Sequence, residues 1–406
     1  MGIPVIDYNG PSNEGVSIHQ NNIKNGYRCD TATAYLGPIS HHRKNLTILT
    51  GHRALRLVVN EQTMVCEGVE VEEEEFLLAE EKKRRAGDLK KGWKGYFSER
   101  KRRFVPVSKE VVVSCGSISS PHLLLLSGMG PKEELEKVGV KCLVNSPDVG
   151  KQLEDHLSLF VRASVKEGSQ TVTERAWMEG DRELKERGEG PLASSAADCS
   201  YFFVSEAGKK VAEPYPDIQL SMIVAPCDED FYHGNLRYTS HFNYYTNPSH
   251  QINPQTEGVC FVITHLHPRS RGSVTLQSSH PLDHPVISTN FLDNQHDLDV
   301  LRCGAEKMVQ VCKQPSLRDL DIQLLIPPHL HNDDQIDWDG YSRHYAKSLY
   351  HPTSTLQMGK VLTPDLRVKG VRGVRVADGS VMPGITSGNT NAPIIMIGEK
   401  VVDFLA

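Results

Sequence analysis

The segment that most constrains this chain lies near its C-terminus, between residues 350 and 400. It begins with a histidine in a turn, His351-Pro352, and continues through Val376-Ala377 to an Asp378-Gly379 step. An asparagine-rich loop, residues 387–393, then opens an apolar segment typical of a helix. Backbone N–H groups at a helix N-terminus favour an electron-rich or anionic partner. The histidine, the strand ending in Asp-Gly and the asparagine-rich loop are therefore interpreted as parts of a cofactor site.

A second informative segment joins a buried strand to a helix. Residues 110–116 show the pattern of a buried strand that ends in a tight turn, and Ser119-Ser120-Pro121 is expected to open a helix with proline near its first turn. Alone, this strand–glycine–helix pattern mostly marks an α/β unit. The string Val149 to His156 follows, and its last two residues, Asp155 and His156, could suggest an acid–base pair. Because adjacent residues rarely share a face, a structural role is the expectation for both.

Together these strings resemble the glucose-methanol-choline (GMC) flavin oxidoreductases. The strings that carry the resemblance are residues 26–36, 116–131, 149–156, 271–276 and 350–398. Ser354 stands where the family usually has glycine, so an altered local turn is expected. Gln152 replaces the family's asparagine and Asp30 its serine.

The resemblance implies an α/β fold of mixed α+β type, with an incomplete FAD-binding Rossmann-like domain and an antiparallel-sheet substrate domain. Residues 1–158 are expected to belong to the FAD-binding part, with 1–40 as a connecting segment and 72–105 as a charged insertion. Residues 159–345 would form the substrate-binding domain. Residues 346–406 would return to the FAD domain and carry the active-site residues.

The residue pattern predicts several elements independently of the family. Strands are expected over residues 43–50, 54–60, 64–72, 159–165, 201–204, 217–224, 259–265 and 271–276, and helices near 31–36, 132–140 and 297–312. Residues 166–196 are charged and contain glycine, and are expected to form a rim or lid.

The resemblance also assigns the chemistry. His351 would be the base that takes the hydroxyl proton of an alcohol, since the ordinary pKa of histidine lies near neutrality. Asn389 would hydrogen-bond the substrate oxygen while FAD accepts hydride at its N5 atom. The residues expected to contact FAD are Ala54 at the adenine, Ala377, Asp378 and Gly379 near the ribityl and phosphate, and Asn389, Asn391, Ala392 and Pro393 along the isoalloxazine.

The strand–Gly-x-Gly-x-x-Gly–helix unit that would cradle the FAD pyrophosphate does not occur in these 406 residues. The chain is therefore expected to match the C-terminal two-thirds of the family's length, and a missing N-terminal segment could act in trans. Three functions stay open: an FAD-dependent alcohol dehydrogenase or oxidase, a non-catalytic binding module without flavin, and a flavin-containing lyase.

Composition narrows the remaining classes. A net charge of −6 argues against a nucleic-acid-binding body, and no apolar run reaches the length of a membrane span. No metal-ligand spacing and no Gly-x-Ser-x-Gly elbow is present, so neither a metal site nor a hydrolase is proposed. Nine scattered cysteines favour free thiols and give a weak lean to an intracellular location. The expected partner is a small-molecule alcohol.

Overall fold

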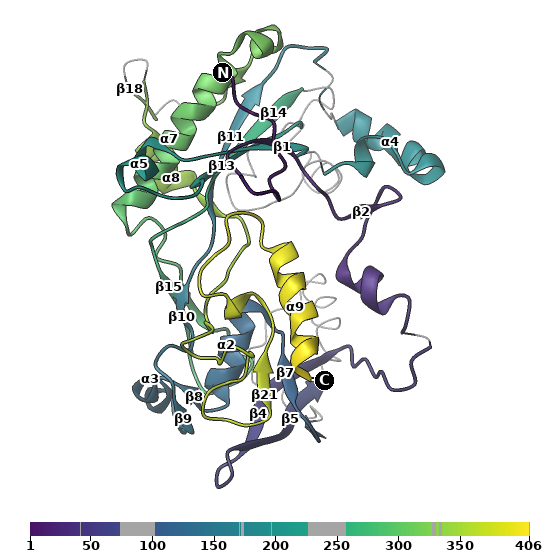
Figure 1. The fold of residues 1–406 in the computed structure, drawn as a ribbon, viewed down its shortest axis with the longest axis vertical. Helices are drawn as coiled ribbons and strands as arrows, with labels where there is room; N and C mark the ends of the chain where they lie inside the picture. Colours follow the sequence, from purple (N-terminus) through teal and green to yellow (C-terminus); the bar gives the residue numbers. More distant parts are fainter. Residues whose placement is uncertain are drawn as a thin grey trace, which may run out of the picture.

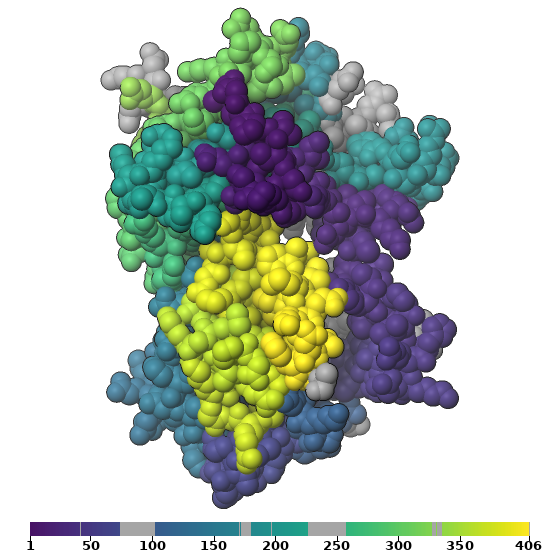
Figure 2. Space-filling view, viewed as in Figure 1, coloured from purple at the N-terminus to yellow at the C-terminus, as the bar shows by residue number. Residues whose placement is uncertain are grey.

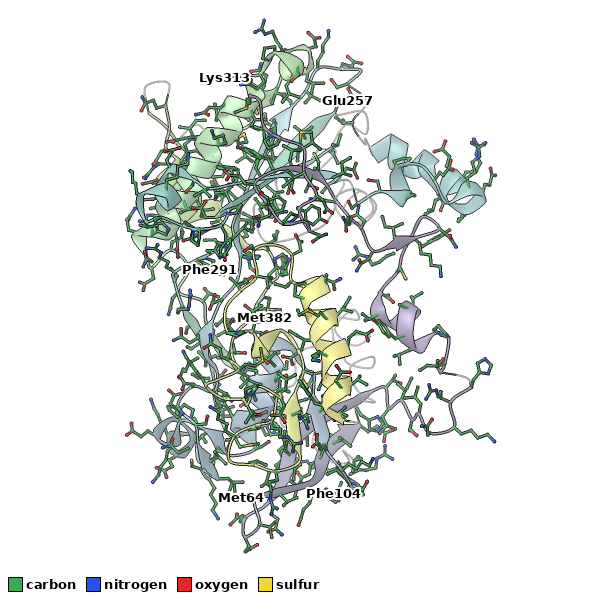
Figure 3. The ribbon with its side chains drawn as sticks, in the orientation of Figure 1. Met64, Phe104, Glu257, Phe291, Lys313 and Met382 are labelled. Carbon is green, nitrogen blue, oxygen red and sulfur yellow. The ribbon has the colours of Figure 1, made fainter. Side chains whose placement is uncertain are left out.

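The structure, a computed structural model, describes residues 1–40, 42–73, 102–169, 171, 174–195, 197–225, 257–326, 330–332 and 335–405. These residues form two halves, shown one above the other in Figure 1, each with its own buried apolar core. Figure 3 places Lys313 near the far end of the upper half, and Met64 and Phe104 at the far end of the lower half. The charged residues 74–101, most of the predicted insertion, lie outside the described part.

The upper half is built on a seven-stranded sheet in the order β1-β12-β13-β14-β11-β17, with β20 also pairing β11. Its pairings are antiparallel, and β11 and β14 match residue for residue from Leu157↔His265 to Ser164↔Gly258. The strands are β1 (Gly15–Ile18), β11 (Leu157–Ser164), β12 (Cys199–Phe203), β13 (Ile218–Ile223), β14 (Gly258–His265), β17 (Gln323–Leu324) and β20 (Lys347–Ser348).

One face of this sheet is covered by helix α7 (Gln295–Cys312), which buries Leu298, Val300, Leu301 and Met308. This spacing places the apolar side chains on one face of the helix, as expected for a helix packed on a sheet. The other helical elements of this half are α4 (Glu174–Arg187), η3 (Pro191–Ala193), α5 (Glu206–Lys210), η5 (Pro315–Leu320) and α8 (Trp338–Tyr345).

The lower half combines a parallel strand pair with small antiparallel sheets. Strands β7 (Val111–Val113) and β21 (Val374–Val376) run parallel, and helices α2 (Gly116–Leu126) and α9 (Asn391–Leu405) contribute to the same core. The antiparallel strands are β4 (His52–Asn60), β5 (Val65–Glu73) and β6 (Arg102–Pro106) in one sheet, and β10 (Lys151–Leu153), β15 (Gly272–Thr275) and β16 (Val286–Ser288) in another.

Short elements complete the described chain. These are β2 (Ile23–Lys24), β3 (Tyr27–Arg28), η1 (Ala32–Leu36), β8 (Met129–Gly130), α3 (Lys132–Lys137), β9 (Val144–Asn145), β18 (His331–Asn332), β19 (Gln335–Ile336) and η7 (Gly379–Val381). The predicted mixed α/β class with antiparallel sheets is confirmed.

Three local predictions were wrong. Residues 43–50 form turns and extended chain instead of a strand, with Leu46 N donating to Arg43 O. The first residues are more than a connection, because β1 pairs β12 and so belongs to the upper sheet. Figure 2 shows this N-terminal segment lying directly above the C-terminal segment.

The third correction concerns Pro121, which lies inside helix α2 and not in its first turn. Proline cannot donate to the carbonyl one helical turn earlier, here that of Ser117. The Thr355 hydroxyl donates to that carbonyl instead, at 2.7 Å. The helix can therefore begin at Gly116, and the same bond fastens it to the segment that follows His351.

Candidate active site

The backbone turn that carries His351 is held by Asp155, a residue at the start of the upper sheet. Asp155 Oδ1 accepts the His351 backbone N–H at 2.9 Å, and Oδ2 accepts the Ser348 hydroxyl. Burial of Asp155 raises the pKa of its carboxyl to about 6, although the bonds from Ser348 and His351 act in the opposite direction. A buried carboxyl is thus used to fix the histidine's backbone.

The ring of His351 contacts a second histidine. His156 Nδ1 and His351 Nδ1 lie 2.8 Å apart, and the two rings meet edge to face at 83°. On its other side, His156 Nε2 lies 3.0 Å from Thr386 O and 3.2 Å from Leu266 O. His156 is fully buried, so its ring is fixed by these three polar contacts and by packing.

Both rings are electrically neutral near pH 7. Burial lowers the pKa of His156 to about 3, and the neighbouring His351 lowers it further in the same direction. Burial also lowers the pKa of His351 to about 4. A desolvated imidazole resists protonation because its cation loses hydration without gaining a counter-ion.

Asn389 lies on the remaining side of the His351 ring. Its Nδ2 atom is 3.5 Å from His351 Nε2, and its side chain is exposed. Helix α9 begins two residues later, with Asn391 and Ala392 exposed and Pro393 half-buried at its first turn. The structure therefore brings the predicted pair His351 and Asn389 together at the N-terminus of α9, where unpaired N–H groups collect.

Asp378 is buried and fully engaged with the protein. Its carboxylate accepts Gly116 N–H at 2.9 Å, the Ser120 hydroxyl at 2.5 Å and Ser380 N–H at 2.8 Å. It thereby caps both helix α2 and the short helix η7, and Ala377 beside it is buried too. Contacts of Ala377, Asp378 and Gly379 with FAD stay predictions, and the Asp378 side chain serves the site by joining two helix starts.

The turn after His351 shows how a residue departing from the family pattern is accommodated. Ser354 has φ of +72°, the left-handed conformation that favours glycine. Its N–H donates to Gly379 O, and its hydroxyl donates to Thr353 Oγ1 at 3.2 Å. The turn keeps the backbone conformation that glycine would adopt, although a serine occupies it. The departure from the family pattern therefore strains the backbone at Ser354 and does not change the path of the chain.

Ala54 lines a cavity of about 430 Å³ whose lining does not include His351. This cavity is lined by residues from β4, from α2 and its preceding turn, and from the 281–285 loop, among them Arg53, Ala54, Cys115, Ser119 and His122. Nearby, the buried Ser117 Oγ has no hydrogen-bond partner among the described residues. Ser117 borders Gly379, where an added Cβ would lie 3.2 Å from its hydroxyl oxygen.

The residue that sequence reasoning missed is His156. Its place beside Asp155 in the 149–156 string was the available signal, but only the fold shows that one residue holds the His351 backbone and the other its ring. Among the described residues, no group of three or more His, Cys, Asp or Glu side chains could hold a metal ion. No helix in the same ranges is long and apolar enough to cross a membrane.

Comparison with known proteins identifies the class. Two GMC oxidoreductase family models match, one over residues 1–158 and the other over residues 268–398. The chain belongs to the GMC oxidoreductase family.

Particular relatives agree with this assignment. The chain is 30% identical to glucose dehydrogenase [FAD, quinone] of Drosophila melanogaster, over 98% of this chain and 59% of that protein. It is 31% identical to the oxygen-dependent choline dehydrogenase of Brucella ovis, over 98% of this chain and 65% of that protein. The chain thus spans about three-fifths to two-thirds of the length of these relatives.

Solved structures match the fold. Formate oxidase aligns with a TM-score of 0.79 at 22% identity, covering 99% of this chain and 67% of that one. Pyridoxine 4-oxidase aligns with a TM-score of 0.73 at 22% identity, covering 99% of this chain and 66% of that one.

Proposed function

We propose that this chain carries the catalytic part of an FAD-dependent oxidoreductase that oxidises a primary or secondary alcohol. The observation that carries the proposal is the neutral His351 ring, whose Nε2 lies 3.5 Å from the exposed Asn389 amide at the N-terminus of α9. A neutral imidazole can accept a proton, and an adjacent amide can bind the oxygen that loses it.

The residues present fit a flavin dinucleotide at two places. The cavity beside Ala54 borders the turn into α2 and could take the adenine end. The unpartnered Ser117 hydroxyl and the exposed start of α9 offer polar contacts toward the ring end. Ala54, Ala377, Asp378, Gly379, Asn389, Asn391, Ala392 and Pro393 are the residues proposed to hold the cofactor.

Each side chain has a distinct task in this proposal. His351 Nε2 takes the hydroxyl proton of the alcohol, while Asn389 Nδ2 hydrogen-bonds the oxygen that becomes the carbonyl. FAD, when bound, supplies the acceptor for the hydride that leaves the alcohol carbon. Asp155 accepts the His351 backbone N–H and so holds the turn that carries the ring. The ring is therefore close to its reactive position before the substrate binds.

The first test is the visible absorption spectrum of the 406-residue chain after incubation with FAD and desalting. We expect a retained flavin spectrum, followed by alcohol-dependent reduction of an artificial electron acceptor. A colourless protein overturns the cofactor part of the proposal for this chain. Flavin retained without any alcohol-dependent reduction, across choline, sugar, aliphatic and aryl alcohols, overturns the redox part and favours a lyase.

The second test assigns the base. His351→Ala should lower turnover by about 10²- to 10⁴-fold while flavin content stays the same, because it removes the proton acceptor. Asn389→Leu, which is similar in size but cannot donate, should cause a smaller loss. Normal turnover in His351→Ala contradicts the assignment.

A further inference from the structure

We propose that His156 is a positioning residue that holds His351 in the tautomer whose Nε2 is free to accept a proton. This inference rests on the proposed function for its consequence, but the tautomer itself can be measured without turnover. It follows from the order of donors and acceptors along one chain of contacts.

This series of hydrogen bonds starts at two backbone carbonyls. Leu266 O and Thr386 O can only accept hydrogen bonds, so His156 Nε2, which contacts both, must carry a hydrogen. In a neutral imidazole the other nitrogen then has a lone pair and no hydrogen. His156 Nδ1 is consequently an acceptor.

The acceptor on His156 sets the state of His351. The two Nδ1 atoms are 2.8 Å apart, a distance that requires one hydrogen between them, and only His351 can supply it. His351 Nδ1 therefore carries the hydrogen and Nε2 has the lone pair. That lone pair lies on the side of Asn389, whose amide Nδ2 is a donor at 3.5 Å.

Burial favours the neutral form of both rings, and neighbouring histidines add to this effect at His156. The titratable groups closest to the pair are Asp155, which bonds the His351 backbone, and the histidines His265 and His267. Asp297 accepts from His265 Nε2 at 3.3 Å, and Ser387 Oγ lies 3.1 Å from His267 Nε2. The hydrogen-bond acceptor behind His351 is thus a neutral ring, whereas a catalytic triad uses a carboxylate for that task.

A neutral acceptor has a different effect from a carboxylate. It fixes which nitrogen carries the hydrogen without stabilising the imidazolium by a full opposite charge. A proton taken up at His351 Nε2 is then held less strongly, which favours its release after the alcohol has been oxidised. His156 contacts one carbonyl in the segment after β14 and another in the loop before α9. These two contacts fix the orientation of the His156 ring relative to both segments.

The test is ¹⁵N NMR of histidine side chains in the flavin-free chain labelled only at histidine, with His351 assigned by comparison with His351→Asn. We expect hydrogen on Nδ1 of His351 and on Nε2 of His156. In His156→Asn the amide oxygen can replace Nδ1 as acceptor, so His351 should keep its tautomer. In His156→Leu, which lacks an acceptor, a substantial fraction of His351 should carry hydrogen on Nε2.

The inference is overturned if wild-type His351 carries its hydrogen on Nε2, or if His156→Leu leaves the His351 tautomer unchanged. Should His156→Leu not fold, the wild-type spectrum still tests the inference, because hydrogen on His351 Nε2 would overturn it. In the flavin-loaded protein, kcat/KM should fall at least tenfold in His156→Leu and only a few-fold in His156→Asn at equal flavin content. An inactive wild-type protein with the expected tautomers would refute the proposed function and leave this inference standing.

Discussion

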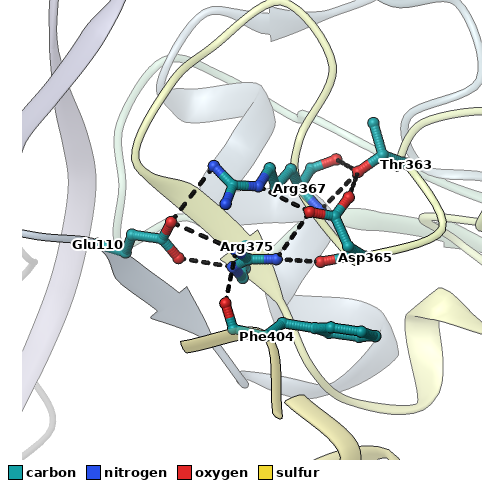
Figure 4. Close-up of polar contacts among 6 residues, drawn as sticks. All are labelled: Glu110, Thr363, Asp365, Arg367, Arg375 and Phe404. Atoms are coloured by element: carbon teal, nitrogen blue, oxygen red, sulfur yellow. Dashed lines mark hydrogen bonds and ion pairs between the residues drawn. The ribbon is translucent and has the colours of Figure 1, made fainter. Parts of the chain in front are cut away.

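Two polar clusters lie at opposite ends of helix α9. One contains a charged arginine with its carboxylates, and the other contains two histidines without charge. At its C-terminal end, Arg375 is fully buried and keeps its charge, with Glu110 at 2.6 Å, the Asp365 side chain at 3.2 Å and the Phe404 carbonyl at 3.0 Å (Figure 4). At its N-terminal end, His156 is buried and His351 half-buried, neither ring contacts a carboxylate, and both stay neutral.

The helix itself explains part of the contrast. The C-terminus of a helix carries partial negative charge and favours a cation, whereas the N-terminus disfavours one. Arg375 donates a hydrogen bond to the Phe404 carbonyl in the last turn of α9. His351 contacts Asn389, which lies two residues before the first residue of α9. Thr363 and then Arg367 hold the pKa of Asp365 down at about 2, so that cluster stays charged. The ion pairs of Arg375 stabilise the fold. The neutral histidine pair instead keeps unprotonated ring nitrogen, which can accept a proton.

The largest expected effect on folding comes from Arg375→Met. It leaves Glu110, Asp365 and the Phe404 carbonyl without their buried cation, and should lower the free energy of unfolding by about 3–4 kcal/mol. Urea denaturation of the chain measures this. The matched control is Arg367→Met, since Arg367 is half exposed and pairs with the same two carboxylates. It should cost less than about 1 kcal/mol, and equal losses would contradict the distinction.

The neutral cluster should appear in the pH dependence of stability. The folded pKa values of His156 and His351, about 3 and about 4, lie below the unfolded value of about 6.5, so the unfolded chain takes up two protons that the folded chain refuses as pH falls. Asp155 acts oppositely, because its folded pKa of about 6 lies above its unfolded value and the folded chain takes one proton.

The net difference is one proton, so these three groups together should cost on the order of 3 kcal/mol of stability between pH 6.5 and pH 4. Unfolding measured across this range, in wild type and in His156→Asn, isolates the share of one histidine. The variant should lose less stability on acidification. An unchanged slope would show that His156 is not held neutral by the fold.

Asp155→Asn tests whether the carboxylate acts by geometry or by charge. The amide oxygen can still accept the His351 N–H, so the free energy of unfolding at pH 7 should change by less than about 1 kcal/mol. Asp155→Ala removes the acceptor and should cost about 1–3 kcal/mol by leaving that N–H unpaired. Equal losses in both variants would point to the charge.

The smallest expected effect has the opposite sign. Ser354→Gly relieves a left-handed backbone and should raise the free energy of unfolding by up to about 1 kcal/mol. Ser354→Ala keeps the Cβ in that conformation and loses the hydroxyl contact with Thr353, so it should be destabilising. Thermal unfolding of the two variants gives the comparison, and a stabilising alanine would contradict it.

Local patterns in the sequence determined much of this protein. The period-2 and apolar segments gave β4, β5 and the strands of the upper sheet, because each pattern is contained in a few neighbouring residues. The family resemblance gave His351 and Asn389, which the fold places 3.5 Å apart. Where an expectation depended on a distant partner it went wrong, as with Pro121, whose helix is possible because Thr355 satisfies the Ser117 carbonyl.

Only the tertiary structure decided what lies behind His351. His156, which contacts the ring of His351, is 195 positions away in the sequence and lies just before β11, and the tautomer that we propose for His351 depends on carbonyls from two further segments. No local sequence pattern predicts the contact between His156 and His351, because that contact depends on the register of the sheet and on the path of the loops. The sequence pointed to His351 as the proposed base, and the contacts made by His156 in the fold are the ground on which we propose that its Nε2 is free.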